Sequence, residues 1–170
     1  SVTGVLEHFD DGSKGDKAVV RLSANTLEEA IFDTYEDKDV LLMLHAHSGL
    51  CKQCGHFAVY FKKLAERFAD LQLDSLVVAR LDVSSESPPS SLKLIGESSL
   101  PTMVMLPAGA KYPPWQFYSG VGKVGPMMKW AHQQAAIPFD LPNLPHLSED
   151  QKDLYKEQVR EREGRFALFR

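Results

Sequence analysis

Two cysteines, Cys51 and Cys54, are the feature that most limits what this sequence can fold into. They are the only cysteines in 170 residues and stand as Cys-Lys-Gln-Cys between an apolar run and an amphipathic segment. A secreted disulfide scaffold needs more cysteines, spread along the chain. Closing so short a loop removes little entropy from the unfolded chain, so a bond here adds little stability. We therefore expect the pair to serve chemistry.

The hydrophobic pattern around the cysteines predicts alternating strands and helices. Val40–Leu44 is a continuous apolar run, typical of a strand buried on both faces. Between Phe57 and Leu71, apolar residues recur on one face of a helix, which places Cys51 near its N-terminus. The alternation predicts an α/β fold with helices on both faces of a central mixed sheet. The other expected elements are strands at 18–22, 76–81, 101–106 and 115–118, a helix from a cap at Asn25 to Tyr35, a helical turn at 92–95, and a helix at 127–136 with Trp130 facing inward.

Segments outside this pattern flank the expected domain at 18–136. Residues 1–17 form an N-terminal extension, in which we expect 10–17 to be a flexible turn or tail. Prolines make 137–147 an extended linker, and Ser148 begins a charged C-terminal helix over 148–170. This helix is either solvated and weakly docked, or it binds a partner outside the domain.

Composition excludes several classes of protein. The net charge is −4 and the Lys and Arg residues are scattered, so we expect no nucleic-acid groove. The longest apolar run is far shorter than the ~20 residues that span a bilayer, and no signal peptide opens the chain. Because the chain starts at Ser1 without Met, we expect a mature or excised fragment, and the missing targeting segments leave the compartment open.

The sequence resembles the thioredoxin superfamily, and most closely the catalytic-type domains of protein disulfide isomerases. The resemblance is carried by the strand at 40–44, by Cys51-Lys52-Gln53-Cys54 with the helix after it, and by Leu100-Pro101-Thr102 opening a later strand. Phe117-Tyr118-Ser119-Gly120, before a Trp-containing helix, is similar to the family's closing hairpin and last helix. The likeness covers about residues 18–136 and implies a thioredoxin-like fold.

The resemblance also implies that Pro101 follows a cis peptide bond and packs beside the cysteines. There Pro101, together with Leu100 and Leu50, would shape a substrate groove. The cis form of an X-Pro peptide bond is only ~0.5–1 kcal/mol less stable than the trans form. The alternative is an ordinary trans proline at the start of a strand.

The implied activity is thiol–disulfide exchange on protein substrates. Cys51 would be the nucleophile, because a helix N-terminus and the positive charge of Lys52 both favour its thiolate. Cys54, one turn later, would resolve the mixed disulfide. Lys52 and Gln53 would tune the redox potential, but their identities do not predict the direction of electron flow. The redox-active disulfide needs no bound cofactor, and we assign no metal.

Several residues depart from the family pattern, and those that matter most concern proton transfer. Leu50 stands where the family has Trp, and the loop from His45 to Leu50 is about one residue longer. The family's buried carboxylate falls at Leu44 or His45 here. His45 titrates near neutrality and is our candidate for the proton role, the alternative being a hydrogen-bonded structural histidine. No Arg is evident in the strand after Pro101, where some isomerases have one. We therefore expect slower turnover than in a typical isomerase domain.

Zinc binding is one alternative function. Cys51 and Cys54 with His45, His47 or His56 would in principle supply four ligands. No second, separated ligand pair is present, and His56 would point away within one helix.

A non-catalytic binding module is the second alternative. Leu50, Leu100, His56 and the turn Tyr112-Pro113-Pro114-Trp115 would form its apolar surface, unless Tyr112 and Trp115 simply pack the hairpin. Two retained cysteines favour redox function, because binding alone needs neither.

The expected partners are protein thiols and disulfides, with a further protein partner possible at the C-terminal helix. We expect no nucleic acid and no membrane segment. The resemblance extends to multi-domain endoplasmic-reticulum proteins built of tandem thioredoxin-like units. It implies the lumen of that compartment, and the cytoplasm is the alternative.

Overall fold

A computed structural model gives the fold and describes residues 9–94 and 100–141. Five strands form one mixed sheet in the order β1-β3-β2-β4-β5. β1, β3 and β2 run parallel, and β4 runs antiparallel to both β2 and β5. The strands are β1 (Val20–Leu22), β2 (Asp39–His45), β3 (Leu76–Asp82), β4 (Thr102–Leu106) and β5 (Gln116–Phe117).

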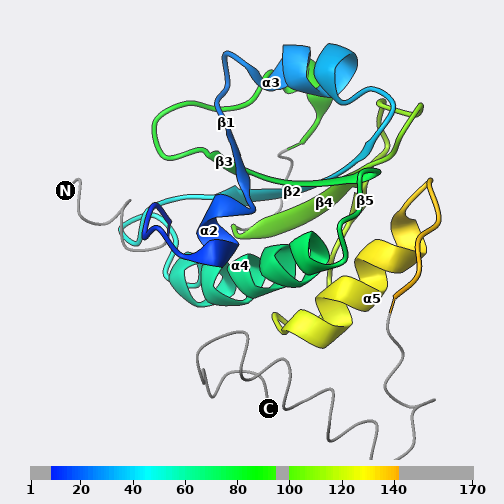
Figure 1. Cartoon of the computed structure of the whole chain (residues 1–170). Helices are drawn as coiled ribbons and strands as arrows, with labels where there is room; N and C mark the ends of the chain where they lie inside the picture. The colour runs from blue at the N-terminus through cyan, green and yellow to red at the C-terminus, as the bar shows by residue number, and fades with distance from the viewer. Residues whose placement is uncertain (1–8, 95–99, 142–170) are drawn as a thin grey trace, which may run out of the picture. The chain divides into compact units, whose positions relative to one another are not determined.

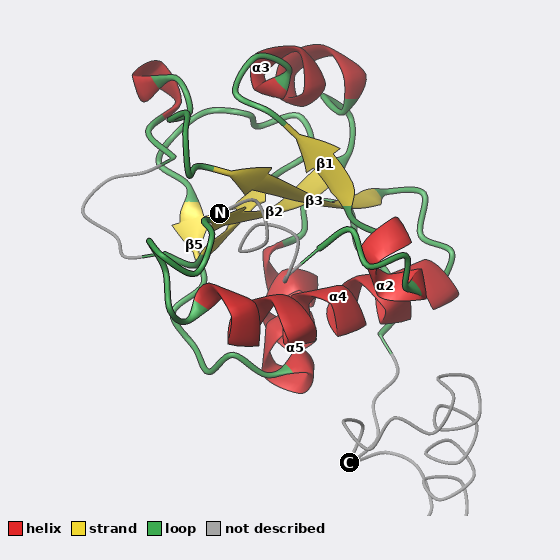
Figure 2. Ribbon diagram, turned by 90° about the vertical axis from the view of Figure 1, so that its left-hand side faces the viewer, coloured by secondary structure: helices red, strands yellow, loops and turns green. Residues whose placement is uncertain are grey.

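Helices cover both faces of the sheet, as Figures 1 and 2 show. One face carries α3 and the π-helical turn that continues it, and the other carries α2, α4 and α5. The helical elements are α2 (Lys14–Lys17), α3 (Leu27–Glu29), the π turn (Ala30–Thr34), α4 (Cys54–Asp70), a 3₁₀ turn (Ser90–Leu92) and α5 (Val124–Gln134). The predicted α/β architecture is confirmed.

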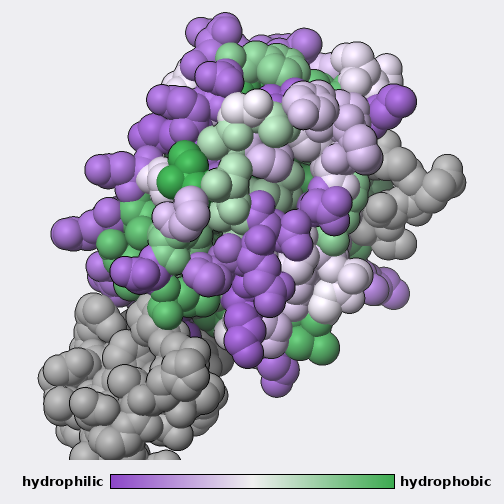
Figure 3. All heavy atoms as spheres, turned by 90° about the vertical axis from the view of Figure 1, so that its right-hand side faces the viewer, coloured by the Kyte–Doolittle hydropathy of each residue, from purple (hydrophilic) through white to green (hydrophobic). Residues whose placement is uncertain are grey.

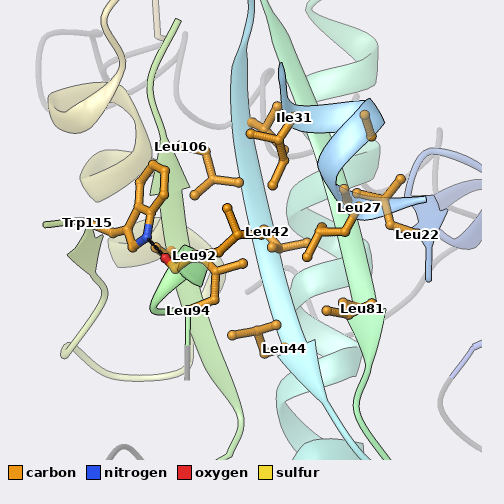
Figure 4. Packing of buried hydrophobic residues seen from close by; sticks show 14 residues of the cluster. Leu22, Leu27, Ile31, Leu42, Leu44, Leu81, Leu92, Leu94, Leu106 and Trp115 are labelled. Carbon is orange, nitrogen blue, oxygen red and sulfur yellow. Dashed lines mark hydrogen bonds between the residues drawn. The ribbon is translucent and has the colours of Figure 1, made fainter. Parts of the chain in front are cut away.

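β2 lies at the centre of the sheet, and all seven of its residues are buried. Val40, Leu42 and Leu44 pack toward α3 in a cluster that also includes residues of β1, β3 and β4 (Figure 4). The indole N–H of Trp115 donates a hydrogen bond to the carbonyl of Leu92, 2.6 Å away, inside this cluster (Figure 4). An apolar run buried on both faces therefore supplies the rigid support from which the cysteine loop emerges.

The N-terminal segment is more ordered than the sequence indicated. We expected residues 10–17 to be a flexible turn or tail, but Lys14–Lys17 form α2 with Ser13 as its N-cap. The Ser13 hydroxyl accepts the backbone N–H of Asp16, and α2 packs on α4. The segment is polar and contains glycine, so its sequence does not predict a helix. The helix is stabilised by tertiary contacts with α4 instead.

Two local predictions were wrong. Asn25 does not cap the helix that follows: Thr26 holds the N-cap position, and its hydroxyl accepts the backbone N–H of Ser23. Trp130 does not face the core but is half-buried, with its ring edge-on to Tyr118 at 5.5 Å between centroids. The buried side of α5 is formed instead by Val124, Met127, Met128 and Ala131.

The chain divides into two units, residues 1–139 and 140–170. The predicted C-terminal helix at 148–170 and most of the proline-rich linker lie outside the described residues. The domain limits at 18–136 stay a prediction. Among the helices within the described ranges, none is long and apolar enough to cross a membrane.

Candidate functional site

Cys51 and Cys54 are joined by a disulfide, with their Cα atoms 5.4 Å apart. They lie where the loop after β2 enters α4, at the left in Figure 1. Cys54 is the first residue of the 17-residue helix, and Cys51 lies three residues before it. Cys51 is 4% exposed and Cys54 is fully buried. The sequence thus predicted both the closeness of the sulfur atoms and their position at a helix start.

The loop that presents Cys51 is held by His47. Its carbonyl accepts the backbone N–H groups of Leu50 and Cys51, each at 3.0 Å. Its own N–H donates to the hydroxyl of Ser84 at 2.9 Å, which anchors the loop to the segment after β3. Gly49 donates its N–H to Nδ1 of His47 at 3.1 Å. These contacts order the longer loop, and sequence reasoning missed both His47 and Ser84 as its supports.

The disulfide packs on an apolar bed. Ala46 forms one buried cluster with the two cysteines, and the half-buried Val83 and Leu100 pack against it. The peptide bond between Leu100 and Pro101 is cis, as the resemblance implied. Leu100, which lies just before β4 and far from the cysteines in sequence, packs against their cluster.

The residues on the outer side of the disulfide are exposed. Leu50 has 61% of its surface exposed, and Lys52 and Gln53 are also exposed. The N-terminal turn of α4 has no side-chain cap and no acidic residue, so its partial positive charge is not offset locally. The cation of Lys52 adds to this positive field. A thiolate formed at Cys51 is stabilised by both effects.

His45 is 2% exposed at the end of β2, on the face toward α4, where it contacts the ring of Phe9. Its register partner on β3 is Asp82. Burial raises the pKa of Asp82, but hydrogen bonds from Ser84 and the nearby charges of His45 and Arg80 outweigh it, so the pKa lies below 3.8. Asp82 is therefore a carboxylate at neutral pH and faces a histidine. Leu44, the other candidate position, lies in the opposite cluster and takes no part in this site.

The histidines proposed as zinc ligands do not converge. His45 is buried in the sheet, the ring of His47 accepts a loop N–H, and the exposed His56 stacks edge-on to Tyr60. Within residues 9–94 and 100–141, no three His, Cys, Asp or Glu side chains gather in a way that could hold a metal ion. The zinc alternative finds no support in this part of the chain.

The turn at 112–115 is split between core and surface. Trp115 is buried in the core, whereas Tyr112 is 65% exposed. Trp115 lines an open hollow of about 340 Å³ together with Lys93, Pro113, Pro114 and Phe117. Figure 3 views the molecule from the side opposite the cysteine loop, and there small apolar areas are separated by hydrophilic residues. The turn is therefore not the apolar surface beside the disulfide; Leu50, next to Cys51, is the exposed apolar residue there.

The fold and the site together define a thioredoxin-fold domain with a disulfide at the start of its long helix. Solved structures of the same fold agree. The J-Trx1 fragment of ERdj5 aligns at 15% identity and a TM-score of 0.53, covering 69% of this chain and 50% of that one. The zinc-bound form of human ERp44 aligns at 16% identity and a TM-score of 0.53, covering 68% and 30%. A complex of ferredoxin:thioredoxin reductase with thioredoxin f2 aligns at 20% identity and a TM-score of 0.51, covering 68% and 93%.

These similarities establish the fold. The chain spans half of the ERdj5 fragment and less than a third of ERp44. No protein-family model and no curated protein matches the sequence. The chemistry must therefore be argued from the chain's own residues.

Proposed function

We propose that this domain exchanges disulfides with protein thiols through Cys51 and Cys54, as an oxidoreductase or isomerase. The observation that carries the proposal is the Cys51–Cys54 disulfide at the start of α4, against which Leu100 of the Leu100–Pro101 segment packs. A structural disulfide closing a three-residue step adds little stability. The supporting loop contacts of His47 are better explained by a need to present Cys51.

The difference in burial between the sulfurs assigns their roles. Cys54 is fully covered, so an incoming thiolate has access only to Cys51. The client thiolate attacks Cys51 Sγ, the S–S bond breaks, and its electron pair stays on Cys54 Sγ, which takes up a proton. In the reverse direction Cys54 loses that proton and attacks the mixed disulfide at Cys51. The S–S bond re-forms, and the client leaves as a thiolate that is protonated by solvent.

A buried Cys54 needs a proton carrier inside the protein. We assign this role to His45, since the imidazole ring both accepts and releases a proton. The support for this assignment is that Ala46, the residue after His45, packs on both cysteines, so His45 lies at the strand end beside the disulfide. The Asp82 carboxylate opposite stabilises the imidazolium that forms. Lys52 tunes the site by charge, and Gln53 is the N-cap residue of α4 without a side-chain capping bond.

Leu50, Leu100 and Pro101 are proposed to contact the client chain. Leu50 is the exposed apolar side chain next to the attacking sulfur, and burying its exposed 61% against a client contributes a favourable free energy of about 1–2 kcal/mol. With Leu50 in place of an aromatic residue and His45 in place of a carboxylate, we propose slower turnover than in a typical isomerase domain. Insulin reduction at the rate of such a domain would refute this point.

The low exposure of Cys51 favours one alternative, a binding module with weak or no redox turnover. Such a module would keep the disulfide closed and use Leu50 and Leu100 to dock a client or partner. We propose the endoplasmic-reticulum lumen as the compartment, on the sequence resemblance, and disulfides form in such an oxidising environment.

Trapping of mixed disulfides decides between exchange and binding. Reduced Cys54→Ser is incubated with oxidised insulin, and the adduct is measured by non-reducing electrophoresis and mass spectrometry. We expect a covalent adduct through Cys51, none with Cys51→Ser, and none with the double variant as the matched control. Absence of an adduct with Cys54→Ser, while the folded variant still binds insulin, would establish the binding module instead.

A further inference from the structure

The N-terminal segment at residues 9–17, here called the latch, is fixed to both β3 and α4. Asp10 pairs with Arg80 at 3.2 Å, Asp11 with Lys62 at 2.8 Å and Lys14 with Asp70 at 2.6 Å. At Gly15 the backbones of α2 and α4 approach so closely that a Cβ would overlap the main chain of Lys62. The latch thus closes over the side of the sheet that carries His45.

Phe9 is the part of the latch that reaches His45. Its side chain is 1% exposed, and its ring centroid lies 4.8 Å from the imidazole centroid at 44°. The guanidinium of Arg80 lies 4.3 Å from the same ring centroid, and the ammonium of Lys62 lies 5.6 Å from it. Phe9 therefore excludes water from His45 and occupies the space that these two cations border.

The charged groups nearest to His45 and to the Arg80 cation come from several elements. On β3, Asp82 is its register partner, and Arg80 lies on the same face. From the latch, Asp10 and Asp16 act on Arg80, as does Arg21 of β1. Burial lowers the pKa of Arg80, and Asp10 opposes that effect. On α4, the cation of Lys62 lies 5.6 Å from the Phe9 ring centroid, and Asp82 is the carboxylate that pairs in register with His45.

We propose that Phe9 is a positioning residue for His45: it packs the imidazole against the Asp82 side of the sheet and keeps bulk water from it. This inference rests on the proposed function, in which His45 carries the proton of Cys54. A sealed histidine exchanges its proton with the thiol rather than with solvent. Opening the latch makes the exchange rate lose its dependence on His45.

Accessibility of the imidazole tests the seal directly. Carbethoxylation of His45 by diethyl pyrocarbonate, followed by peptide mass spectrometry, is compared between the oxidised wild type, Phe9→Ala and Phe9→Leu. We expect the His45 reaction to rise on the order of tenfold in Phe9→Ala and less in Phe9→Leu, since reaction follows the open population. The exposed His56 is the internal control, and Phe32→Ala, which removes an exposed ring on the opposite face, is the control variant. If Phe9→Ala does not fold, the comparison rests on Phe9→Leu. Equal protection of His45 in the wild type and Phe9→Leu would then refute the claim that Phe9 keeps water from His45.

The pH profile of insulin reduction tests positioning, which a merely structural role would not change. We expect the wild type and Phe32→Ala to share one pH dependence of the rate, and we expect its loss in both His45→Gln and Phe9→Ala. Phe9→Leu retains it in part. The double variant Phe9→Ala/His45→Gln should show the profile of His45→Gln, because Phe9 acts through His45.

The outcomes separate this inference from the proposed function. A Phe9→Ala profile equal to wild type, or a double variant with a profile different from that of His45→Gln, overturns the positioning role of Phe9. An unchanged profile in His45→Gln overturns it as well, while Cys51 adducts in Cys54→Ser still support exchange. Loss of those adducts overturns the proposed function itself.

Discussion

Substitution of Asp39 should destabilise the fold far more than its position at a strand start suggests. Asp39 is fully buried, and its carboxylate accepts three backbone N–H groups at 2.9 Å, from Ala108, Ala136 and Ile137. It therefore ties the first residue of β2 to the loop after β4 and to the segment that follows α5. A matching cation, Lys111, lies in the same region.

Lys111 is buried with its ammonium among backbone carbonyls. The carbonyls of Tyr35, Glu36, Lys38 and Pro107 lie 2.7 to 3.2 Å from Nζ and share its three N–H donors. Burial lowers the pKa of Lys111, and the charge of Asp39 is the first of the effects that oppose it. Removal of the Asp39 carboxylate thus leaves buried N–H groups without their acceptor and a buried cation without its main counter-charge.

The expected loss follows from these contacts. Asp39→Ala removes three charge-assisted hydrogen bonds and leaves their donors buried. Removing one partner of a buried ionic interaction typically lowers the free energy of unfolding by about 3–5 kcal/mol, and we expect a loss of this size. Asp39→Asn keeps one amide oxygen at the position that accepts both Ala108 and Ala136, but turns an NH₂ toward Ile137, so about 1.5–3 kcal/mol is expected. The ordering of the two variants is as informative as their size.

Urea unfolding followed by far-UV circular dichroism measures both free energies. The exposed Asp33 is the matched control, and Asp33→Ala should change the free energy of unfolding by no more than about 0.5 kcal/mol. A loss below about 1 kcal/mol in Asp39→Ala, or a larger loss in Asp39→Asn, would refute the argument that these three bonds hold α5 to the sheet.

Two further substitutions test the latch. Gly15→Ala should destabilise the protein by about 1–3 kcal/mol in urea unfolding, because the added Cβ meets the backbone of Lys62. Gly125→Ala, where nothing lies within 4 Å of the added Cβ, should stabilise it by up to about 1 kcal/mol through helix propensity. A gain in stability at both sites would contradict the close packing at Gly15. Partial burial raises the pKa of Asp11, but hydrogen bonds from Lys62 and Ser13 prevail and lower it from 3.8 to about 2. The ionised Asp11 therefore stabilises the fold above pH 3.8, and this contribution is lost as the pH falls through about 2. Asp11→Asn should lose less stability between pH 4 and pH 2 than the wild type does. Equal losses would show that Asp11 is unpaired in solution.

The central strands and the cysteine site could be predicted because local sequence determines them. An apolar run such as Val40–Leu44 has few alternatives to a strand buried on both faces, and β2 extends it by one residue at each end. Cys51 and Cys54 are close in sequence, so they are close in any helix start. The cis bond before Pro101 followed from family resemblance, not from the residues themselves.

The latch and the Asp39 contacts could not be predicted, because their partners are distant in sequence. Phe9 is an aromatic residue followed by polar residues, and in the fold its ring contacts His45, Arg80 and Lys62. Asp39 accepts N–H groups from positions 69 to 98 residues away. A charged residue beside an apolar run indicates a strand end, and its backbone partners are set only by the tertiary fold.

The proposed exchange chemistry is tested most directly by a redox titration of Cys51–Cys54 against glutathione, followed by mass spectrometry of alkylated protein. A thiolate stabilised by the start of α4 and by Lys52 predicts a reduction potential of about −180 to −230 mV, where the pair exchanges with the glutathione pool. A pair that stays oxidised to below about −300 mV would behave as an inert cross-link and contradict the assignment of Cys51 as a nucleophile.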